Sequence, residues 1–418
     1  MMDRELLQDL FRTAVAAADP SRAIAASLPP YPTGRTIVVG AGKAAAQMAR
    51  AFEQAWNEPV EGLVVTRYGH TAPTSHIEVV EAAHPVPDEA GYLAARRMMA
   101  KVHGLGPDDL VVALISGGGS ALLPAPGPGM TLEDEQAITQ ALLASGLPIG
   151  QMNLIRCELS GIKGGRLAAL AWPAKVVTLI VSDVAGDNPA LVASGPTIPI
   201  DSSRAEARHL VALSNLALPP AAQHLLAGTE NESPRPGDAR FAHNSHRIIA
   251  SAALSLEMAA QRARATGIPA HILSDAIEGE ARDVASTLAA ITREIARHQR
   301  PFARPALLLS GGETTVTIRG NGRGGRNAEF LLAFAIAIDG VEGVSAIAAD
   351  TDGIDGMGDN AGAYADSTTV ARLRASGIDP RAALANNDAW TAFNAIGDLI
   401  ITGPTGTNVN DFRAILIR

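Results

Sequence analysis

The sequence predicts an α/β protein of two Rossmann-like domains with mainly parallel sheets. Two observations support this prediction: short apolar, β-branched runs alternate with segments of helical periodicity, and glycine-rich loops follow several of those runs. Runs that are apolar at consecutive positions are typical of parallel strands, because helices cover both faces of such a sheet. At 418 residues the chain exceeds one ordinary domain of ~100–200 residues, so two domains are expected.

The alternation predicts the elements in order along the chain. In the first half, strands are expected at 36–39, 63–65, 77–80, 110–115 and 175–181, with helices at 43–56, 88–103 and 131–145. In the second half, a long helix is expected near 245–266, with strands near 270–273, 306–309, 314–318 and 344–348. Residues 411–418 alternate apolar and polar side chains, which predicts a final strand with one exposed face.

A stretch rich in glycine, proline and small polar residues, GTENESPRPGD at 228–238, interrupts this rhythm. Such stretches are typical of domain boundaries. We therefore expect one domain at 1–235 and a second at 236–418. The amino terminus spaces Leu6, Leu10 and Ala14 on one face of a helix, which predicts a docked helix and not a targeting segment.

Composition narrows the classes of function. A formal charge of −9 argues against duplex nucleic acid as a partner, because such surfaces neutralise many phosphates. Cys157 is the one cysteine, which excludes an intramolecular disulfide and a Cys-based zinc site. No apolar run approaches the ~18 residues that span a bilayer. We expect a cytoplasmic protein that binds small molecules and has no membrane contact.

The first glycine-rich loop, IVVGAGKAA, follows the first expected strand. Gly40 and Gly42 permit a tight turn before a helix whose free N–H groups favour phosphate. The loop also matches the dinucleotide fingerprint G-x-G-x-x-A, which is weak when it stands alone. Lys43 adds a charge that could neutralise a transferring phosphoryl group. The Walker spacing G-x-x-x-x-G-K-[ST] is absent.

The second loop, SGGGSALLPAP, follows the strand at 110–115. Three consecutive glycines and a serine predict a nest of backbone N–H groups for an anion, with a tight turn as the structural alternative. The expected ligands are Ser116, Gly117, Gly118, Gly119 and Ser120.

Further cations and carboxylates follow in the first half. Lys163 and Arg166 flank a glycine pair, with Asn153 and Arg156 upstream, a combination that suits a phosphate or carboxylate. Asp183 and Asp187 follow the strand at 175–181, where open α/β sheets bind ligands, and are candidate Mg²⁺ ligands. The alternative for the second of these is turn chemistry, because Asp-Asn-Pro is a good turn. His84, in HPVPDE, is a further substrate-site candidate.

The second half repeats the combination of a glycine turn and a cation. SGGE ends one strand, GRGGRNAEF places Arg326 at a helix start, and AADTDGIDG follows another strand with acids two and three residues apart. The EF-hand order is not met, so metal and phosphate chemistry is preferred over a calcium module. The candidates are Ser310, Gly311, Gly312, Glu313 and Gly325 for anions, Asp350 and Asp352 for metal, and Thr405 and Asn408 in the loop TGPTGTNVND.

Taken together, these loops resemble the class II glycerate kinases, also called the MOFRL family, whose members are sometimes labelled hydroxypyruvate reductases of tartrate degradation. The resemblance covers nearly the whole chain. It rests on GAGKAA, HPVPD, SGGGSALL, SGIKGGRLA, SDVAGD, ASGPT, SGGE, GRGGRNAEF, TDGIDG and TGPTGTNVND.

The resemblance implies ATP-dependent phosphorylation of D-glycerate to 2-phosphoglycerate with Mg²⁺, in a cleft between the two domains. It places the family's proposed catalytic lysine and arginine on Lys43 and Arg326. Asp187 and Asp352 are the alternatives for the base that deprotonates the 2-hydroxyl. The oligomeric state stays open, with a homodimer among the options.

Two rival functions remain at this point. An NAD(P)H-dependent hydroxypyruvate reductase fits G-x-G-x-x-A, but the second strand ends in Thr66 and Arg67 where a dinucleotide site needs an acid for the ribose. A non-catalytic sugar-phosphate sensor would use the same loops to bind anions. No DNA-binding motif supports it.

Overall fold

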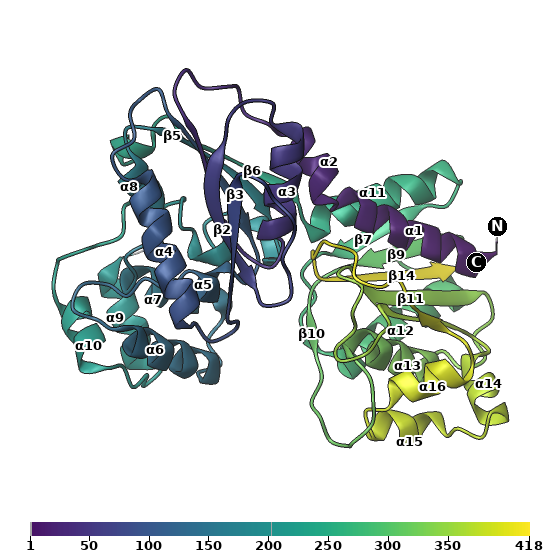
Figure 1. Ribbon diagram of the computed structural model, residues 1–418. Helices are drawn as coiled ribbons and strands as arrows, with labels where there is room; N and C mark the ends of the chain where they lie inside the picture. The colour runs from purple at the N-terminus through teal and green to yellow at the C-terminus, as the bar shows by residue number, and fades with distance from the viewer. Residues whose placement is uncertain (1, 202) are drawn as a thin grey trace. The chain divides into compact units, whose positions relative to one another are not determined.

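A computed structural model describes residues 2–201 and 203–418, and its contacts divide the chain into two compact units (Figure 1). The N-terminal unit is Pro20–Ile249. The C-terminal unit combines Ala250–Arg418 with the segment that ends at Asp19. Both units are built of helices and strands, so the α/β class predicted from the sequence is confirmed.

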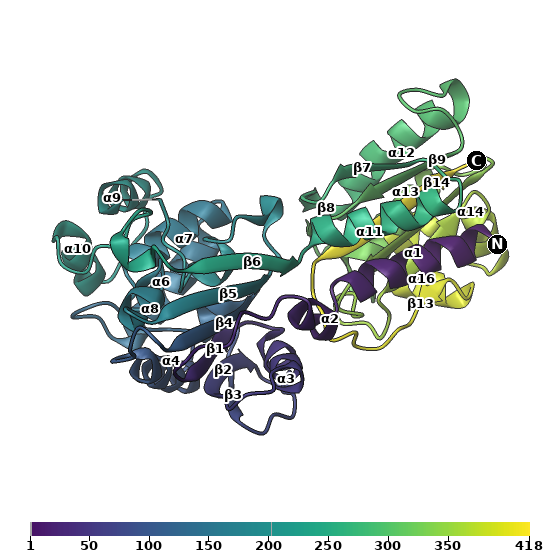
Figure 2. The same cartoon turned by 90° about the horizontal axis from the view of Figure 1, so that it is seen from above.

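A six-stranded sheet forms the centre of the N-terminal unit, in the order β3-β2-β1-β4-β5-β6 (Figure 2). This is the strand order of dinucleotide-binding folds, with the switch in winding direction between β1 and β4. The pairs that join β3, β2, β1, β4 and β5 are all parallel, as expected. The strands are β1 (Thr36–Ala41), β2 (Glu61–Arg67), β3 (Ile77–Ala82), β4 (Leu110–Ser116), β5 (Lys175–Val181) and β6 (Ser245–Ala250).

Helices cover both faces of this sheet, with α4 and α8 on one side and α3 on the other (Figure 1). Ile37, Val39 and Ala41 of β1 share a core with the buried face of α4, as the alternation of side chains along a strand requires. Four more helices, α6, α7, α9 and α10, form a smaller core of their own. The helices are α2 (Pro20–Ala25), α3 (Ala45–Ala55), α4 (Glu89–Val102), α5 (Gly119–Leu122), α6 (Leu132–Ala144), α7 (Ile149–Glu158), α8 (Arg166–Ala171), α9 (Arg204–Leu213) and α10 (Pro220–Ala227), with 3₁₀ turns η1 (Ala185–Asp187), η2 (Val192–Ser194) and η3 (Ala239–Phe241).

The C-terminal unit has a six-stranded sheet of different character, in the order β13-β12-β11-β14-β9-β7. Here the expectation of a mainly parallel sheet is wrong, because only β7 and β9 pair in parallel and the other four pairs are antiparallel. The chain turns back after β11 to form β12, and β14 enters between β9 and β11. The strands are β7 (Ala270–Ser274), β9 (Ala306–Ser310), β11 (Val344–Asp350), β12 (Gly362–Asp366), β13 (Leu399–Ile400) and β14 (Asp411–Ile417), and β8 (Gly279–Glu280) pairs with β10 (Thr314–Thr315) separately.

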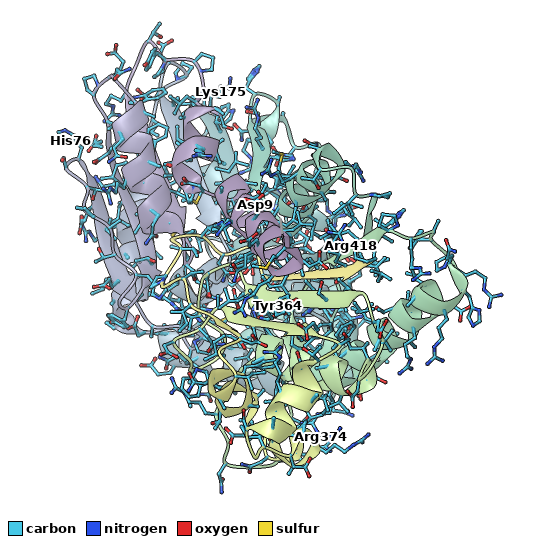
Figure 3. All side chains as sticks on the ribbon, turned by 90° about the vertical axis from the view of Figure 1, so that its right-hand side faces the viewer. Asp9, His76, Lys175, Tyr364, Arg374 and Arg418 are labelled. Atoms are coloured by element: carbon cyan, nitrogen blue, oxygen red, sulfur yellow. The ribbon has the colours of Figure 1, made fainter. Side chains whose placement is uncertain are left out.

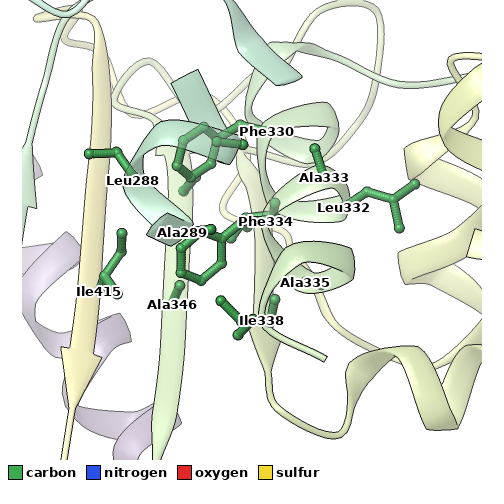
Figure 4. Packing of buried hydrophobic residues seen from close by; sticks show 14 of the residues in the cluster. Leu288, Ala289, Phe330, Leu332, Ala333, Phe334, Ala335, Ile338, Ala346 and Ile415 are labelled. Carbon is green, nitrogen blue, oxygen red and sulfur yellow. The ribbon is translucent and has the colours of Figure 1, made fainter. Parts of the chain in front are cut away.

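Helices also cover both faces of the second sheet. One core lies under α12 and α13, where the Phe330 and Phe334 rings stack with centroids 6.1 Å apart (Figure 4). The opposite core lies under α1 and α11. The helices are α1 (Asp3–Ala17), α11 (Ala252–Ala265), α12 (Ala281–His298), α13 (Arg326–Ala337), α14 (Thr369–Ala375), α15 (Pro380–Ala385) and α16 (Ala389–Ala395).

The contacts differ from the expected division into 1–235 and 236–418. The helix α1 packs its apolar face on α11, so it belongs to the C-terminal unit although it precedes the first strand. Asp9 on α1 accepts a hydrogen bond from Arg262 Nε at 2.7 Å, and Arg4 lies over the ring of Tyr364. Figure 3 labels Asp9 and Tyr364. At the other end, β6 completes the sheet of the N-terminal unit, which moves the boundary to Ile249.

Two elements of the second half also differ from their predictions. The helix expected near 245–266 begins only at Ala252, because Ser251 caps it by accepting a hydrogen bond from Leu254 N, and the residues before it form β6. The final strand is present, but it has no exposed face. Its polar residues Asp411 and Arg413 are buried against each other in the middle of the sheet.

No helix among the described residues is long and apolar enough to cross a membrane.

Candidate active site

The loop after β1 lies at the switch point of the N-terminal sheet, where α/β folds bind ligands. Its backbone amides already donate hydrogen bonds to other groups of the protein. Four consecutive amide groups donate hydrogen bonds: Gly42 N to Val65 O (3.1 Å), Lys43 N to Gly117 O (2.8 Å), Ala44 N to Ser116 Oγ (3.0 Å) and Ala45 N to Gly42 O (3.1 Å). The first three amides therefore fasten the loop to β2 and to the end of β4, and the fourth closes a turn within the loop.

The two glycines of this loop serve packing. A β-carbon at Gly40 would lie 2.3 Å from Leu114 O, and one at Gly42, where φ is +137°, would lie 2.1 Å from Ser116 Oγ. Only glycine fits at both positions. The phosphate cradle expected from Gly40, Gly42 and Ser116 is thus filled by the protein's own groups, and the Lys43 side chain remains as the loop's contribution to a ligand.

The Lys43 side chain is half-buried beside the second glycine loop. A β-carbon placed at Gly118 would lie 3.2 Å from both Lys43 Cγ and His84 Nε2, so the two side chains pack over this glycine. No carboxylate of the described residues lies within ion-pair distance of Lys43. Loss of hydration and then the positive charges of Lys43 and Arg67 lower the pKa of His84 to about 4, although the residue keeps an exposed face.

The second loop keeps backbone groups available for a ligand. The amides of Gly118, Gly119 and Ser120 find no acceptor within the described chain, in contrast to the loop after β1. A β-carbon at Gly117 would lie 1.7 Å from Asp183 Oδ2, so this glycine admits the Asp183 carboxylate next to the loop. The structure therefore brings together Lys43, three amides without an acceptor in the described chain, and the Asp183 carboxylate.

A chain of polar side chains continues from this loop to α7. Ser120 Oγ lies 2.8 Å from Ser194 Oγ, which donates to Asn153 Oδ1 at 3.0 Å. Arg156 Nη1 donates to the same oxygen at 3.1 Å. Ser194 has a positive φ of 59°, a conformation that non-glycine residues rarely adopt. The sequence groups Asn153 with Lys163 and Arg166, whereas the structure links it through Ser194 to the second glycine loop.

The two cations expected beside Asn153 are occupied by the protein. Lys163 is buried, and its Nζ donates to Glu135 Oε1 at 2.7 Å and to Leu123 O at 3.0 Å. Arg166 Nη1 donates to Cys157 O, Lys163 O and Ser233 Oγ at 2.6 to 3.0 Å, and burial lowers the pKa of this guanidinium. Lys163 therefore ties its loop to α6, and Arg166 ties α8 to α7 and to residues 231–233. We no longer expect either side chain to bind a phosphate.

Asp187 lies downstream of Asp183 in the turn η1. Its φ is +52°, and its amide donates to Val184 O at 3.1 Å. Non-glycine residues in this conformation are concentrated at functional sites and in turns. The structure is thus compatible with both interpretations of Asp187 from the sequence, a functional carboxylate and a turn residue.

In the C-terminal unit, Arg326 begins α13 and is surrounded by acids. It donates from Nε to Asp411 Oδ1 (2.8 Å), from Nη1 to Glu313 Oε1 (3.0 Å) and from Nη2 to Asp350 Oδ2 (2.7 Å). Although burial lowers the pKa of this guanidinium, the charges of Asp411, Asp350 and Glu313 raise it above its usual value. Arg326 and two of its predicted neighbours are thus brought together.

Two of the three carboxylates around Arg326, those of Asp350 and Asp411, are deeply buried. Burial and the nearby charge of Asp352 raise the pKa of Asp350 well above its usual value, while Arg326 lowers it. Asp411 also accepts a hydrogen bond from Arg413, which is fully buried. This group of alternating charges forms a network at the ends of β11 and β14.

The amino end of α13, expected to attract an anionic ligand, is closed by an internal carboxylate. Asp355 Oδ1 accepts a hydrogen bond from Asn327 N at 2.9 Å, and Asp355 Oδ2 accepts one from Ala328 N at 2.8 Å. A β-carbon at Gly325 would lie 2.4 Å from Asp355 Cγ, so the glycine makes room for this cap. Burial raises the pKa of Asp355 to about 6, against the effect of these hydrogen bonds.

The remaining candidates of the second half lie in loops that bond to one another. Gly311 N donates to Ser274 O at 2.8 Å next to the buried Ser310, and Gly312, with φ of +110°, packs on Ile277. Asp352 accepts from Ile354 N and, through its carbonyl, from Thr405 N, and Asn408 accepts from Asn410 N at 3.1 Å. These groups shape the loops around the Arg326 network.

The four expected metal ligands lie in different units: Asp183 and Asp187 in the N-terminal unit, Asp350 and Asp352 in the C-terminal one. Within the part of the chain that the structure describes, no three His, Cys, Asp or Glu side chains gather closely enough to hold a metal ion.

Two family models match separate parts of the chain. Residues 6–227 match a domain of unknown function, DUF4147, and residues 306–411 match the MOFRL family. A D-glycerate 2-kinase of Thermotoga maritima is 39% identical over 99% of this chain and 98% of its own length. The chain belongs to the MOFRL family of glycerate kinases.

Other members of the MOFRL family carry two kinds of name. A crystal structure named glycerate kinase, from Thermotoga maritima, superposes with a TM-score of 0.91 at 39% identity and covers 99% of both chains. An Agrobacterium vitis protein, 52% identical over 99% of this chain and 94% of its own, is named "Putative hydroxypyruvate reductase". The expected recognition and the enzyme class, a phosphotransferase family, are confirmed by the kinase relatives.

Several groups of the site carry no recognisable signal in the sequence. An Ala-Ser-Gly segment gives no sign of the unusual backbone conformation of Ser194. Asp411 and Asn327 were passed over because their contacts come from segments about 84 residues apart. His84 was noted only for its proline-rich surroundings, and its position over Gly118 became visible in the structure alone.

Proposed function

We propose that this protein transfers the γ-phosphoryl group of ATP to the 2-hydroxyl of D-glycerate and so forms 2-phosphoglycerate. The observation that carries the proposal is the contrast within the loop after β1: its amides are bonded to β2 and β4, while Lys43 has no carboxylate partner in the described residues. A loop of this kind offers a ligand one positive charge that no carboxylate of the described residues neutralises. That is the contribution a phosphoryl-transfer site requires.

The chemistry divides among a few groups. Lys43 neutralises charge that develops on the phosphoryl oxygens, and the amides of Gly118, Gly119 and Ser120 donate hydrogen bonds to an oxyanion. Asp187 accepts the proton of the 2-hydroxyl, and its positive φ supports a functional position. Asp352 is a weaker candidate, because its carboxylate is engaged by Ile354 N. Arg326, which corresponds to the family's proposed catalytic arginine, is a second candidate for a role in catalysis.

The carboxylates of the proposed site can supply only one or two ligands to a divalent ion. Mg²⁺ takes one or two carboxylates and otherwise binds substrate phosphates and water, so the absence of a three-acid cluster among the described residues is compatible with it. Asp183, which lies next to Gly117 of the second loop, is the carboxylate we assign to it. When bound, the ion would neutralise charge on the nucleotide phosphates.

The alternative, an NAD(P)H-dependent hydroxypyruvate reductase, has the name of the Agrobacterium vitis relative in its favour. Dinucleotide sites, however, place the pyrophosphate on the amides of G-x-G-x-x-G/A, and here those amides are occupied. The end of β2 also lacks the ribose-binding acid, since Thr66 is buried with its hydroxyl directed to Lys43 O. The structure therefore favours the kinase.

One experiment separates these functions. The purified protein is incubated with ATP, Mg²⁺ and D-glycerate, and the product is identified by ³¹P and ¹H NMR. We expect 2-phosphoglycerate formed in equal amount with ADP. NADH oxidation with hydroxypyruvate, without ADP release from ATP and glycerate, would contradict the proposal, and 3-phosphoglycerate would contradict its regiochemistry.

A further inference from the structure

Four buried or half-buried basic side chains lie on or near α7, α8 and α9, and the protein itself binds three of them. Lys163 is paired with Glu135 at 2.7 Å, Arg204 with Glu158 at 3.5 Å, and Arg166 donates to backbone carbonyls and hydroxyls. Arg156, on the last turn of α7, is different. Its one hydrogen bond within the described chain goes from Nη1 to Asn153 Oδ1 at 3.1 Å.

The positive charge of Arg156 has no negatively charged group of the described residues in contact with it. No carboxylate of the described residues lies within 4.0 Å of its guanidinium. The acid that acts on it from a distance, Glu135, is already bonded to Lys163 Nζ. Burial lowers the pKa of Arg156, which means that the charged side chain has lost part of its hydration without gaining an ion pair. A half-buried cation in this state favours an anionic ligand.

The position of Arg156 connects it to the proposed site. The Asn153 oxygen that accepts from Arg156 also accepts from Ser194 Oγ at 3.0 Å, and Ser194 Oγ lies 2.8 Å from Ser120 Oγ in the second glycine loop. Asn153 and Ser194 are both buried, which restricts the side chains on either side of them. The guanidinium is therefore held at a fixed offset from the loop that we assign to phosphoryl transfer.

We propose that Arg156 binds the carboxylate of the hydroxy-acid substrate, with Asn153 and Ser194 as positioning residues. This inference rests on the proposed function, because it identifies the group that recognises the acceptor in that same site. A guanidinium presents two parallel N–H donors that match the two oxygens of a carboxylate. With Lys43 assigned to the transferring phosphoryl group, the carboxylate is the remaining charge of the substrate that needs a partner.

The test measures binding of D-glycerate and of ATP separately, by titration calorimetry and by steady-state kinetics. For Arg156→Ala we expect the Kd and KM for D-glycerate to rise by about 100-fold, while the KM for ATP stays unchanged, because one partner of a desolvated charge pair is removed. Arg156→Lys keeps the charge but loses the fork, so we expect an intermediate rise. Arg208→Ala is the matched control, since that exposed arginine of α9 also donates one hydrogen bond, to Leu226 O.

Thermal melting of each variant shows whether it is folded, and Arg156→Lys serves if the alanine variant is not. Unchanged D-glycerate binding in both variants, or a rise in the KM for ATP alone, would overturn the inference. Its failure is distinct from failure of the proposed function. If the wild-type protein forms no phosphoglycerate, the phosphotransferase proposal fails, while calorimetry with D-glycerate still decides whether Arg156 binds a small carboxylate.

Discussion

Lys43 and Arg326 occupy the same local pattern in the two units, a cation that follows a glycine turn at or near the start of a helix, yet their electrostatic states are opposite. Lys43 packs beside His84 with no carboxylate in contact among the described residues. Arg326 is bound by three carboxylates, two of them almost fully buried. A free cation is ready to bind an incoming anion, whereas a neutralised cation primarily holds its own surroundings together.

The backbone around the two residues shows the same contrast. In the C-terminal unit, Asp355 closes the start of α13 with hydrogen bonds from Asn327 N and Ala328 N. In the N-terminal unit, the start of α3 has no side-chain cap, and free amides are found at the neighbouring loop after β4. The N-terminal unit thus has a positive charge and backbone donors available for a ligand, whereas the C-terminal network fixes the position of the Arg326 side chain. Substitutions should separate these two properties.

The largest effect is expected for Lys43→Ala. Removal of the free charge should lower kcat/KM for phosphoryl transfer by at least ~10³-fold, as loss of a cation on the transferring group does in other phosphotransferases. The melting temperature should change little, because the side chain makes no ion pair that the fold depends on. Activity is followed by coupled ADP release and stability by thermal unfolding.

The control for this variant is Lys175→Ala, at the exposed start of β5, which should behave as wild type. Near-normal turnover of Lys43→Ala would remove the lysine from the mechanism. A large loss of stability would show that the residue is structural, and the contrast with Arg326 would then be false.

Arg326→Ala should affect both activity and stability. It leaves Asp350 and Asp411 buried with less compensation, which costs about 3–5 kcal/mol of unfolding free energy when one partner of a buried pair is removed. The double variant Arg326→Ala, Asp350→Asn removes one of the stranded charges. We expect it to recover part of the stability but none of the activity, as measured by urea denaturation and ADP release. Equal melting temperatures for wild type and Arg326→Ala would show that the network does not depend on the arginine.

The sequence was sufficient to predict what depends on short segments. The buried strands followed by glycine loops predict the parallel sheet of the N-terminal unit, because the sequence pattern of each βα unit lies within one short segment of the chain. The proximity of Lys43 to the second glycine loop also follows, since β1 and β4 end at the same edge of one sheet.

What could not be predicted depends on partners that are distant in sequence. The register that buries Arg413 between Asp411 and Thr314 inverts the ordinary expectation that polar positions of a strand face water. Lys163 and Arg166 beside a glycine pair resemble ligand-binding cations until Glu135 and residues 231–233 come into place. Arg156 lies only a few residues upstream, and the free cation was distinguished from the bound ones by tertiary contacts alone.

The smallest expected effect is a pH dependence of stability that belongs to Asp355. Burial raises its pKa from 3.8 to about 6 in the folded protein, so the folded state retains this proton over a range in which the unfolded chain has lost it. Stability from this group is therefore fully present below pH ~4 and is lost as the pH rises towards ~6, by about 3 kcal/mol at 1.36 kcal/mol per pKa unit. Asp355→Asn has no such proton to lose.

The free energy of unfolding is measured by urea denaturation between pH 4 and 7, and the advantage of wild type over Asp355→Asn should shrink across this range. A constant difference would mean that the two backbone hydrogen bonds from α13 outweigh burial and keep the carboxylate ionised, in which case the cap of α13 is a fixed negative charge beside Arg326.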